Sequence, residues 1–233
     1  MTIARKLTAE FLGTTGLLAI VVGSGIMGER LANGNAAIAL LGNSIATGAG
    51  LIVLLYGFGN ISGAHFNPLV TVSETIGGKV NWTTGIWYCL VQVAGAIFGV
   101  VIANLMFALP AINTSTKLRE GPAQFLGEFV ATFGLIAVIR LGVRFHPGLV
   151  GAMVACFITA AYWFTSSTSF ANPAVTVARS LSNTFAGIAP SSVPMFIAAQ
   201  IAGAIAAVLV FRWLLAEEKI DDRETANPGS VHR

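Results

Sequence analysis

Six long stretches of apolar residues are the feature of this sequence that most limits how it can fold. A helix that crosses a bilayer needs about 20 predominantly apolar residues. Stretches of this kind occupy residues 7–27, 36–58, 85–109, 122–141, 149–164 and 193–215. Only 10% of the 233 residues are charged, whereas a typical soluble domain carries about 25%. The sequence therefore predicts an all-α membrane protein that crosses the bilayer six times.

Composition and motif content argue against several classes of protein. The charges are too few to cover a water-exposed surface, which disfavours a soluble enzyme. The 13 Lys and Arg residues need no nucleic acid to explain them, because basic residues at membrane edges set orientation. No nucleophile–base pair, phosphate-binding loop or metal-ligand spacing is present in the sequence. We therefore expect no enzymatic activity, no metal, no cofactor and no nucleic-acid partner.

Two further apolar stretches, residues 67–76 and 172–183, are about half as long as a spanning helix. Each begins with Asn-Pro. Asparagine is a strong helix N-cap, and proline is favoured in the first helical turn because its φ is preset and its missing N–H is not needed there. Each stretch is therefore predicted to be a short helix with a sharply defined start.

The two halves of the sequence resemble each other. Residues 10–19 match 128–137, residues 67–72 match 172–177, and residues 92–97 match 200–205, in the same order. Each half holds three spans and one short helix, and an odd number of crossings inverts the second half relative to the first. The short helices then enter from opposite sides, and their Asn-Pro ends meet near the bilayer midplane, an architecture known in transport proteins.

The repeat also sets the predicted organisation of the chain. The first repeat covers residues 1–109 and includes the half-helix 67–76. A linker loop covers 110–121, and the second repeat covers 122–216 with the half-helix 172–183. Residues 217–233 form a polar tail.

These motifs resemble those of the aquaporin, or major intrinsic protein, superfamily. The resemblance rests on residues 62–71 and 169–176, on the paired Glu10 and Glu128, and on the order of the repeats, and it covers nearly the whole chain. It implies an inverted repeat of six transmembrane helices and two re-entrant half-helices, one pore per protomer and a homotetramer. The overall pattern is similar to bacterial aquaglyceroporin-like members associated with arsenic resistance.

The resemblance assigns the two Asn-Pro motifs to the centre of the pore. These motifs are Asn67-Pro68-Leu69 and Asn172-Pro173-Ala174. The half-helices place positive dipole ends at the midplane, which opposes cations, while the asparagine amides can donate to a solute oxygen. Leu69 departs from the family pattern, which usually has Ala at that position; its bulk is expected to affect packing rather than the dipoles.

Counting without gaps from the two asparagines gives the positions of the family's outer constriction. They are Thr47, Ala160, Ser169 and Val175. Water-specific members of the family that this chain resembles carry Phe, His, a small residue and Arg at these positions. This chain lacks the usual arginine. The result is predicted to be a wide, neutral constriction that passes polyols, urea-like solutes or arsenite as As(OH)₃, together with water.

Three other residues are candidates for the pore mouths or wall. Arg179 lies one helical turn beyond Val175, so it either restores a charge at the outer mouth, which would favour a water-selective channel, or anchors at the lipid interface. Glu74 is its repeat counterpart at the inner mouth. His65 resembles a family position that lines the inner pore, with a purely structural role as the alternative.

Glu10 and Glu128 are the acids that fall well inside the predicted spans. An intramembrane acid is by default a functional candidate, which leaves open a proton-coupled transporter that uses both glutamates. The resemblance implies a structural role instead, in which each carboxylate holds a re-entrant loop. A third hypothesis is a non-conducting junction protein on the same scaffold.

The distribution of basic residues predicts the orientation in the membrane. Of the 13 Lys and Arg residues, nine fall on the side that carries both termini and four on the other. Positive residues are enriched on the cytoplasmic side, so both termini are predicted to be cytoplasmic, in a bacterial inner membrane. Tyr162, Trp163 and Phe164 fit an aromatic belt at the membrane interface, or core packing.

Overall fold

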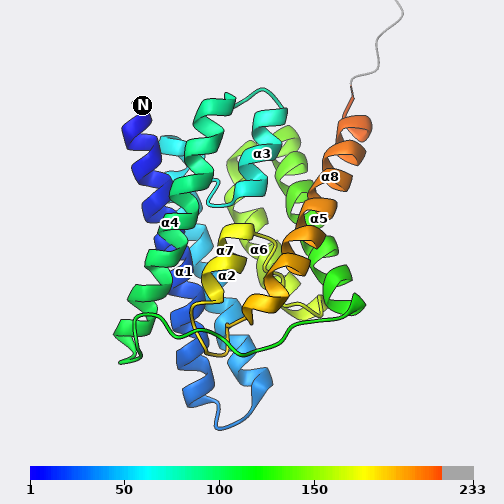
Figure 1. Ribbon diagram of the computed structural model, residues 1–233. Helices are drawn as coiled ribbons and strands as arrows, with labels where there is room; N and C mark the ends of the chain where they lie inside the picture. The colour runs from blue at the N-terminus through cyan, green and yellow to red at the C-terminus, as the bar shows by residue number, and fades with distance from the viewer. Residues whose placement is uncertain (217–233) are drawn as a thin grey trace, which may run out of the picture.

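The computed structural model describes residues 1–216, whose regular elements are helices joined by loops (Figure 1). The predicted polar tail, 217–233, lies outside the described residues. Short 3₁₀ turns at Pro147–Leu149 and Pro190–Ser192 precede two of the helices. The α-helices are α1 (Ile3–Leu31), α2 (Ala36–Ser62), α3 (Pro68–Ile76), α4 (Trp82–Met106), α5 (Pro122–Phe145), α6 (Val150–Phe164), α7 (Pro173–Arg179) and α8 (Val193–Leu214).

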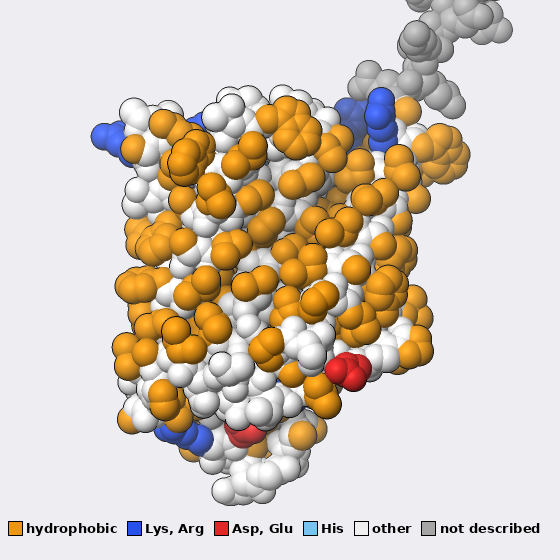
Figure 2. Space-filling view, viewed as in Figure 1, with side chains coloured by type: hydrophobic (Ala, Val, Ile, Leu, Met, Phe, Trp, Pro, Cys, Tyr) orange, Lys and Arg blue, Asp and Glu red, His pale blue; other side chains and the backbone are white. Residues whose placement is uncertain are grey.

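Six helical segments are long and apolar enough to cross a membrane, which confirms the predicted number of spans. They are Ile3–Leu31, Ala36–Ser62, Trp82–Met106, Pro122–Phe145, Pro147–Phe164 and Pro190–Leu214. Figure 2 shows apolar side chains covering the middle of the visible face, with charged side chains gathered near its two ends. This distribution suits a protein whose sides face lipid.

Both ends of the described chain lie on one face of the molecule, which we call the termini face (Figure 1). The linker 110–121 crosses the opposite face, which we call the linker face. The half-helix α3 leads from the centre to the termini face, and α7 leads from the centre to the linker face. The two halves of the chain are therefore inverted relative to each other.

Glycines at equivalent positions of the two repeats allow close helix packing. A Cβ added at Gly95 of α4 would lie less than 3 Å from the carbonyl oxygen of Phe11 in α1. Gly203 of α8 meets the carbonyl oxygen of Phe129 in α5 in the same way. Small residues let backbones approach in this manner in membrane helices, so α1–α4 and α5–α8 form equivalent pairs.

The helix α7 ends at Arg179, so the prediction that it continues to residue 183 was wrong. Beyond Arg179 the backbone turns and pairs with the linker. The N–H of Ser115 donates to Ser180 O at 2.9 Å, and the N–H of Asn113 donates to Leu181 O at 3.0 Å. These carbonyls are satisfied by a neighbouring segment rather than by a further helical turn.

Candidate pore

Each half-helix begins at the predicted Asn-Pro pair. Asn67 caps α3, with its Oδ1 accepting the N–H of Leu69 at 2.9 Å. Asn172 caps α7, with its Oδ1 accepting the N–H of Ala174 at 3.0 Å. The prolines that follow, Pro68 and Pro173, are the first residues of the two helices. The Leu69 side chain packs against the hydrophobic core and is absent from the cavity wall described below.

The two asparagines also join the half-helices to each other at the centre of the molecule. The amide nitrogen Nδ2 of Asn67 donates to Ala171 O at 2.8 Å, and that of Asn172 donates to Phe66 O at 2.8 Å. An amide carries two N–H donors, and no second acceptor is recorded for either Nδ2 among residues 1–216. One N–H of each asparagine thus has no acceptor within the described residues.

The buried Glu10 carboxylate holds the re-entrant loop that precedes α3. It is fully buried. Its Oε1 accepts from Ser62 Oγ at 2.5 Å and His65 N at 3.0 Å, and its Oε2 accepts from Phe66 N at 2.8 Å and Gln92 Nε2 at 2.8 Å. Phe66 has a φ of 48°, a left-handed conformation that costs a non-glycine residue about 1–3 kcal/mol. The carboxylate thus stabilises a strained loop.

Glu128 performs the same task in the second repeat. It is fully buried and accepts from Phe170 N at 2.8 Å, Ala171 N at 2.9 Å and Gln200 Nε2 at 2.6 Å. Ala171 has a φ of 49°. Each glutamate is thus occupied by hydrogen bonds that fix one loop, and no hydrogen-bonded chain between the two carboxylates is recorded in residues 1–216.

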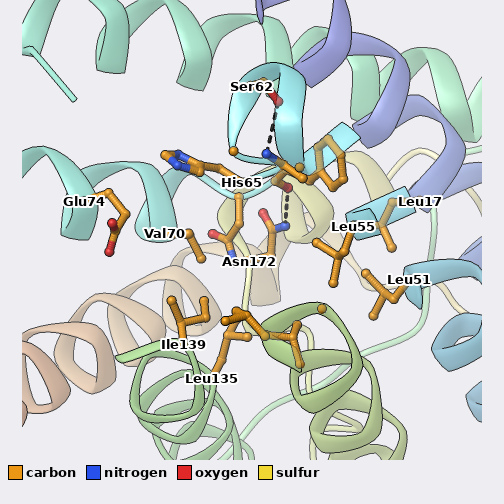
Figure 3. A pocket seen from close by; sticks show the side chains of 18 of the residues that line it. Leu17, Leu51, Leu55, Ser62, His65, Val70, Glu74, Leu135, Ile139 and Asn172 are labelled. Atoms are coloured by element: carbon orange, nitrogen blue, oxygen red, sulfur yellow. Dashed lines mark hydrogen bonds between the residues drawn. The ribbon is translucent and has the colours of Figure 1, made fainter. Parts of the chain in front are cut away.

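A cavity of about 940 Å³ passes along both asparagines. Near the termini face its wall includes Glu74 and Lys79, and toward the linker face it includes Arg179. Figure 3 shows Asn172 in this cavity opposite apolar side chains such as Leu55. The passage therefore has a line of polar groups on one side and a hydrocarbon wall on the other.

The predicted residues at the termini-face end of the cavity line its wall. Glu74 is the only carboxylate among the lining residues that the structure describes, and Lys79 Nζ lies 2.8 Å from its Oε2. His65 Nδ1 lies 3.0 Å from Thr71 Oγ1, and the His65 ring packs edge-on against Tyr88. His65 thus contributes to the wall and is also held by structural contacts.

Three of the four predicted constriction residues line the cavity, and one does not. Thr47, Ser169 and Val175 are buried in its wall. Ala160 is exposed on the outer side of α6 and is absent from the wall, so its assignment was wrong. Tyr162, two residues further along α6, lines the wall instead, with its hydroxyl 3.3 Å from Thr47 Oγ1.

The helical period explains this error. Adjacent residues in an α-helix are separated by about 100°, so positions two apart point to nearly opposite sides. Ile158 and Tyr162, four apart, both line the cavity, whereas Ala160 between them faces outward. Trp163 and Phe164 are exposed, as expected for a belt, but Tyr162 is not part of it.

Arg179 lies at the linker-face end of the cavity rather than at the lipid surface. It is only 2% exposed. Its Nε donates to Ala186 O, and its guanidinium carbon lies 3.4 Å from the centroid of the Phe170 ring. No hydrogen bond of its two terminal amino groups is recorded in residues 1–216. The wall is therefore not neutral at this end, in contrast to the predicted constriction.

Two basic residues of the linker support the same region, and no motif in the sequence pointed to them. Arg119 donates from Nε to Gly187 O at 2.9 Å and from Nη1 to Ser167 O at 3.3 Å. Lys117 Nζ donates to Phe185 O at 2.8 Å. Burial lowers the pKa of Arg119 to about 10 and that of Lys117 to about 8. Their positions in a loop without a spacing pattern gave no signal.

Six spans, two half-helices that meet at their N-terminal ends and a polar passage between them define a transmembrane channel rather than an enzyme. Comparison with known proteins agrees with this class. The sequence model described as "Major intrinsic protein" matches residues 1–146. The chain belongs to the major intrinsic protein family.

Relatives extend the match over nearly the whole chain. Aquaglyceroporin AqpS of Rhizobium meliloti is 50% identical over 224 residues, 96% of each chain. Glycerol uptake facilitator protein-like 6 of Lactiplantibacillus plantarum is 28% identical over 92% of this chain and 100% of that one. Among solved structures, the aquaglyceroporin from Plasmodium falciparum has the same fold, with a TM-score of 0.68 at 20% identity over 97% of this chain and 100% of that one.

Proposed function

We propose that this protein is a passive channel for water and small uncharged, hydroxyl-bearing solutes such as glycerol, and that As(OH)₃ also passes. The observation that carries the proposal is the pair of asparagine amides, each with one N–H left to donate, at the facing N-terminal ends of α3 and α7. A solute oxygen can accept from both, while a cation meets two positive helix ends.

The two-sided wall favours solutes that carry both hydroxyl and apolar surface. Leu51 and Leu55 present hydrocarbon on one side, and Asn67 and Asn172 present donors on the other. Glycerol matches both sides. Arsenite is neutral at pH 7 and is rich in hydroxyls, as glycerol is. The names of the relatives, an aquaglyceroporin and a glycerol facilitator, support the glycerol part of the proposal.

The proposed selectivity constriction consists of Thr47, Tyr162, Ser169, Val175 and Arg179. Val175 is the position at which the family resemblance expects arginine, and its side chain is buried in the wall. Ser169 lines the wall, and its hydroxyl oxygen is buried and has no hydrogen-bond partner among the described residues. These contacts set the size and polarity of the solute that passes.

The test is stopped-flow light scattering of proteoliposomes against water, glycerol, urea and arsenite. We expect the wild-type protein to conduct glycerol and arsenite, and Val175→Arg to reduce both fluxes by more than about tenfold while water flux remains, since tenfold corresponds to only 1.4 kcal/mol of added barrier. Val175→Leu, which adds bulk without charge, is the matched control. Unchanged glycerol and arsenite flux in Val175→Arg would contradict this constriction.

A water-selective channel is the second candidate, and the position of Arg179 favours it. Its terminal amino groups adjoin the passage and can donate to a solute. The family resemblance gives this role to the filter arginine of water-specific members. In that case the wild-type protein conducts water but no glycerol, and Arg179→Met admits glycerol. Glycerol flux in the wild-type protein rejects this second candidate.

Orientation and assembly are parts of the same proposal. The excess of basic residues on the termini face supports a cytoplasmic location for that face, in a bacterial inner membrane. The family resemblance supports a homotetramer with one pore per protomer. Protease accessibility of the chain ends in sealed vesicles tests the orientation, and the mass of the detergent-solubilised complex tests the assembly.

A further inference from the structure

A second hollow, of about 430 Å³, lies apart from the pore at the termini face. Two of the residues that line this hollow carry a positive charge, and no lining residue is acidic. The remainder of the wall is glycine or apolar. We call it the arginine groove; it is lined by Ile76, Gly77, Arg140, Val208, Phe211, Arg212 and Leu215.

The internal repeat shows that this groove is incomplete. The position equivalent to Arg212 in the first repeat is Asn104, and the position equivalent to Gly77 is Ser182. On the linker face these two equivalents are fully buried, and Asn104 Nδ2 donates to Ala111 O of the linker at 3.1 Å. On the termini face Arg212 and Gly77 are exposed. On the linker face, the linker thus covers the site equivalent to the arginine groove. On the termini face, the described chain leaves the arginine groove open.

The groove lies where the hydrocarbon region gives way to headgroups. Arg212 is in the last turn of α8, which is the end of the sixth span. Next to it, Trp213 is 78% exposed and Leu209 is 62% exposed. Ile76, at the end of α3, is 55% exposed. In the membrane these apolar surfaces face lipid, so a lipid molecule can enter the groove from the side.

The two arginines suit a phosphodiester group. Arg140 Nη2 donates to Ser73 O at 3.0 Å and Ser73 Oγ at 2.9 Å, which fixes the guanidinium and leaves its other N–H groups to bind an anion. The side chain of Arg212 makes no hydrogen bond or ion pair with any residue of the described chain, 1–216. Guanidinium groups bind phosphate oxygens through paired N–H donors, and basic pockets between membrane helices bind anionic headgroups.

We propose that the arginine groove binds an anionic phospholipid, with its phosphate between Arg140 and Arg212 and an acyl chain along Val208 and Phe211. A free phosphate ion would leave the apolar wall unused. The sequence that follows Ala216 begins with charged residues and offers little apolar surface to that wall. A lipid matches the charge and the hydrocarbon of the groove together.

Native mass spectrometry of the full-length protein with added phosphatidylglycerol or phosphatidylethanolamine tests the proposal. We expect retention of phosphatidylglycerol by the wild-type protein and an affinity about fivefold lower in Arg212→Gln, the factor that corresponds to ~1 kcal/mol per basic residue near the membrane surface. Ile76→Trp, which fills the groove and keeps both charges, is expected to displace the lipid. Arg5→Gln removes an exposed charge elsewhere on the same face and is the matched control.

Each alternative has its own outcome. Equal retention of the two lipids, or an equal loss in Arg5→Gln and Arg212→Gln, overturns the proposal. Competition by inorganic phosphate at millimolar concentration, without loss in Ile76→Trp, identifies a simple anion site and also overturns it. A large gain in lipid retention after removal of residues 217–233 identifies the tail as the occupant. Unchanged water flux in the variants shows that they are folded, and the proposal does not depend on which solute the pore conducts.

Discussion

Replacing Glu10 with glutamine separates a structural role of this carboxylate from proton coupling. The two side chains have the same shape, but glutamine presents an NH₂ group where the glutamate has an oxygen. Each oxygen of Glu10 faces two donors, including the backbone N–H groups of His65 and Phe66. Whichever way the amide points, at least one of these buried N–H groups loses its acceptor.

The contacts set the magnitude of the effect. A buried donor without a partner costs about 1–3 kcal/mol, and each remaining hydrogen bond loses about 1 kcal/mol when its acceptor is no longer charged. We therefore expect Glu10→Gln to lower the free energy of unfolding by about 3–5 kcal/mol. The control is Glu29→Gln, because Glu29 is exposed and accepts one bond, from Phe185 N at 3.1 Å; its effect should stay below about 1 kcal/mol.

The assay combines thermal unfolding of the purified full-length proteins in detergent with solute flux in liposomes, with and without a pH gradient. A channel dissipates a solute gradient and shows no accumulation driven by protons, in the wild-type protein or in Glu10→Gln. Wild-type thermal stability in Glu10→Gln, together with loss of accumulation driven by a pH gradient, would refute the structural role and identify a proton-coupled carrier.

Two further predictions concern helix packing and the linker. Gly203→Ala is expected to destabilise the protein by about 1–3 kcal/mol, because the added Cβ meets the Phe129 carbonyl. The control is Gly57→Ala, whose added Cβ meets nothing within 4 Å. Equal thermal midpoints of the two variants would contradict the packing of α5 against α8. Partial burial lowers the pKa of Lys117 from 10.5 to about 8. Below about pH 8 the charged ammonium is partly buried in the folded protein and solvated in the unfolded one, so the charge lowers the free energy of unfolding. The thermal midpoint of the wild-type protein, measured relative to Lys117→Met, should therefore rise from pH ~7 to ~9.5, and a fall over this range would contradict the buried charge.

The fold was largely predictable because its determinants are local. Spanning length, the Asn-Pro starts and the order of the repeats all lie in continuous segments of the sequence. The helices begin at Pro68 and Pro173 as expected, since a cap and a proline fix a start without help from distant residues. The end of α7 was not predictable in this way, because it depends on pairing with the linker.

The constriction was predicted less completely because it is assembled from separate segments. Counting back from Asn172 across the loop to α6 assumes a fixed loop length, and that count reached the outward-facing Ala160 instead of the cavity-lining Ile158 or Tyr162. The contribution of Arg119 depends on how the linker folds over the linker face. No periodicity within the linker carries that information.

The internal repeat offers a way to separate scaffold from specificity in this chain. Glu10 and Glu128 match, and their equivalent partners Gln92 and Gln200 make the same bonds in both halves. Such matched residues hold the loops and cannot by themselves distinguish one mouth from the other.

The mismatched pairs lie where the two faces differ. Glu74 at one end of the cavity is replaced by Arg179 at the other, and the niche around Asn104 is closed by the linker while its counterpart around Arg212 is open. A solute that enters from the termini face meets a carboxylate paired with Lys79, and one that enters from the linker face meets a guanidinium. The preference for one solute over another at the two mouths should therefore respond to substitutions at Glu74 and Arg179, whereas substitutions at the matched, loop-holding Glu10 and Glu128 should chiefly alter stability.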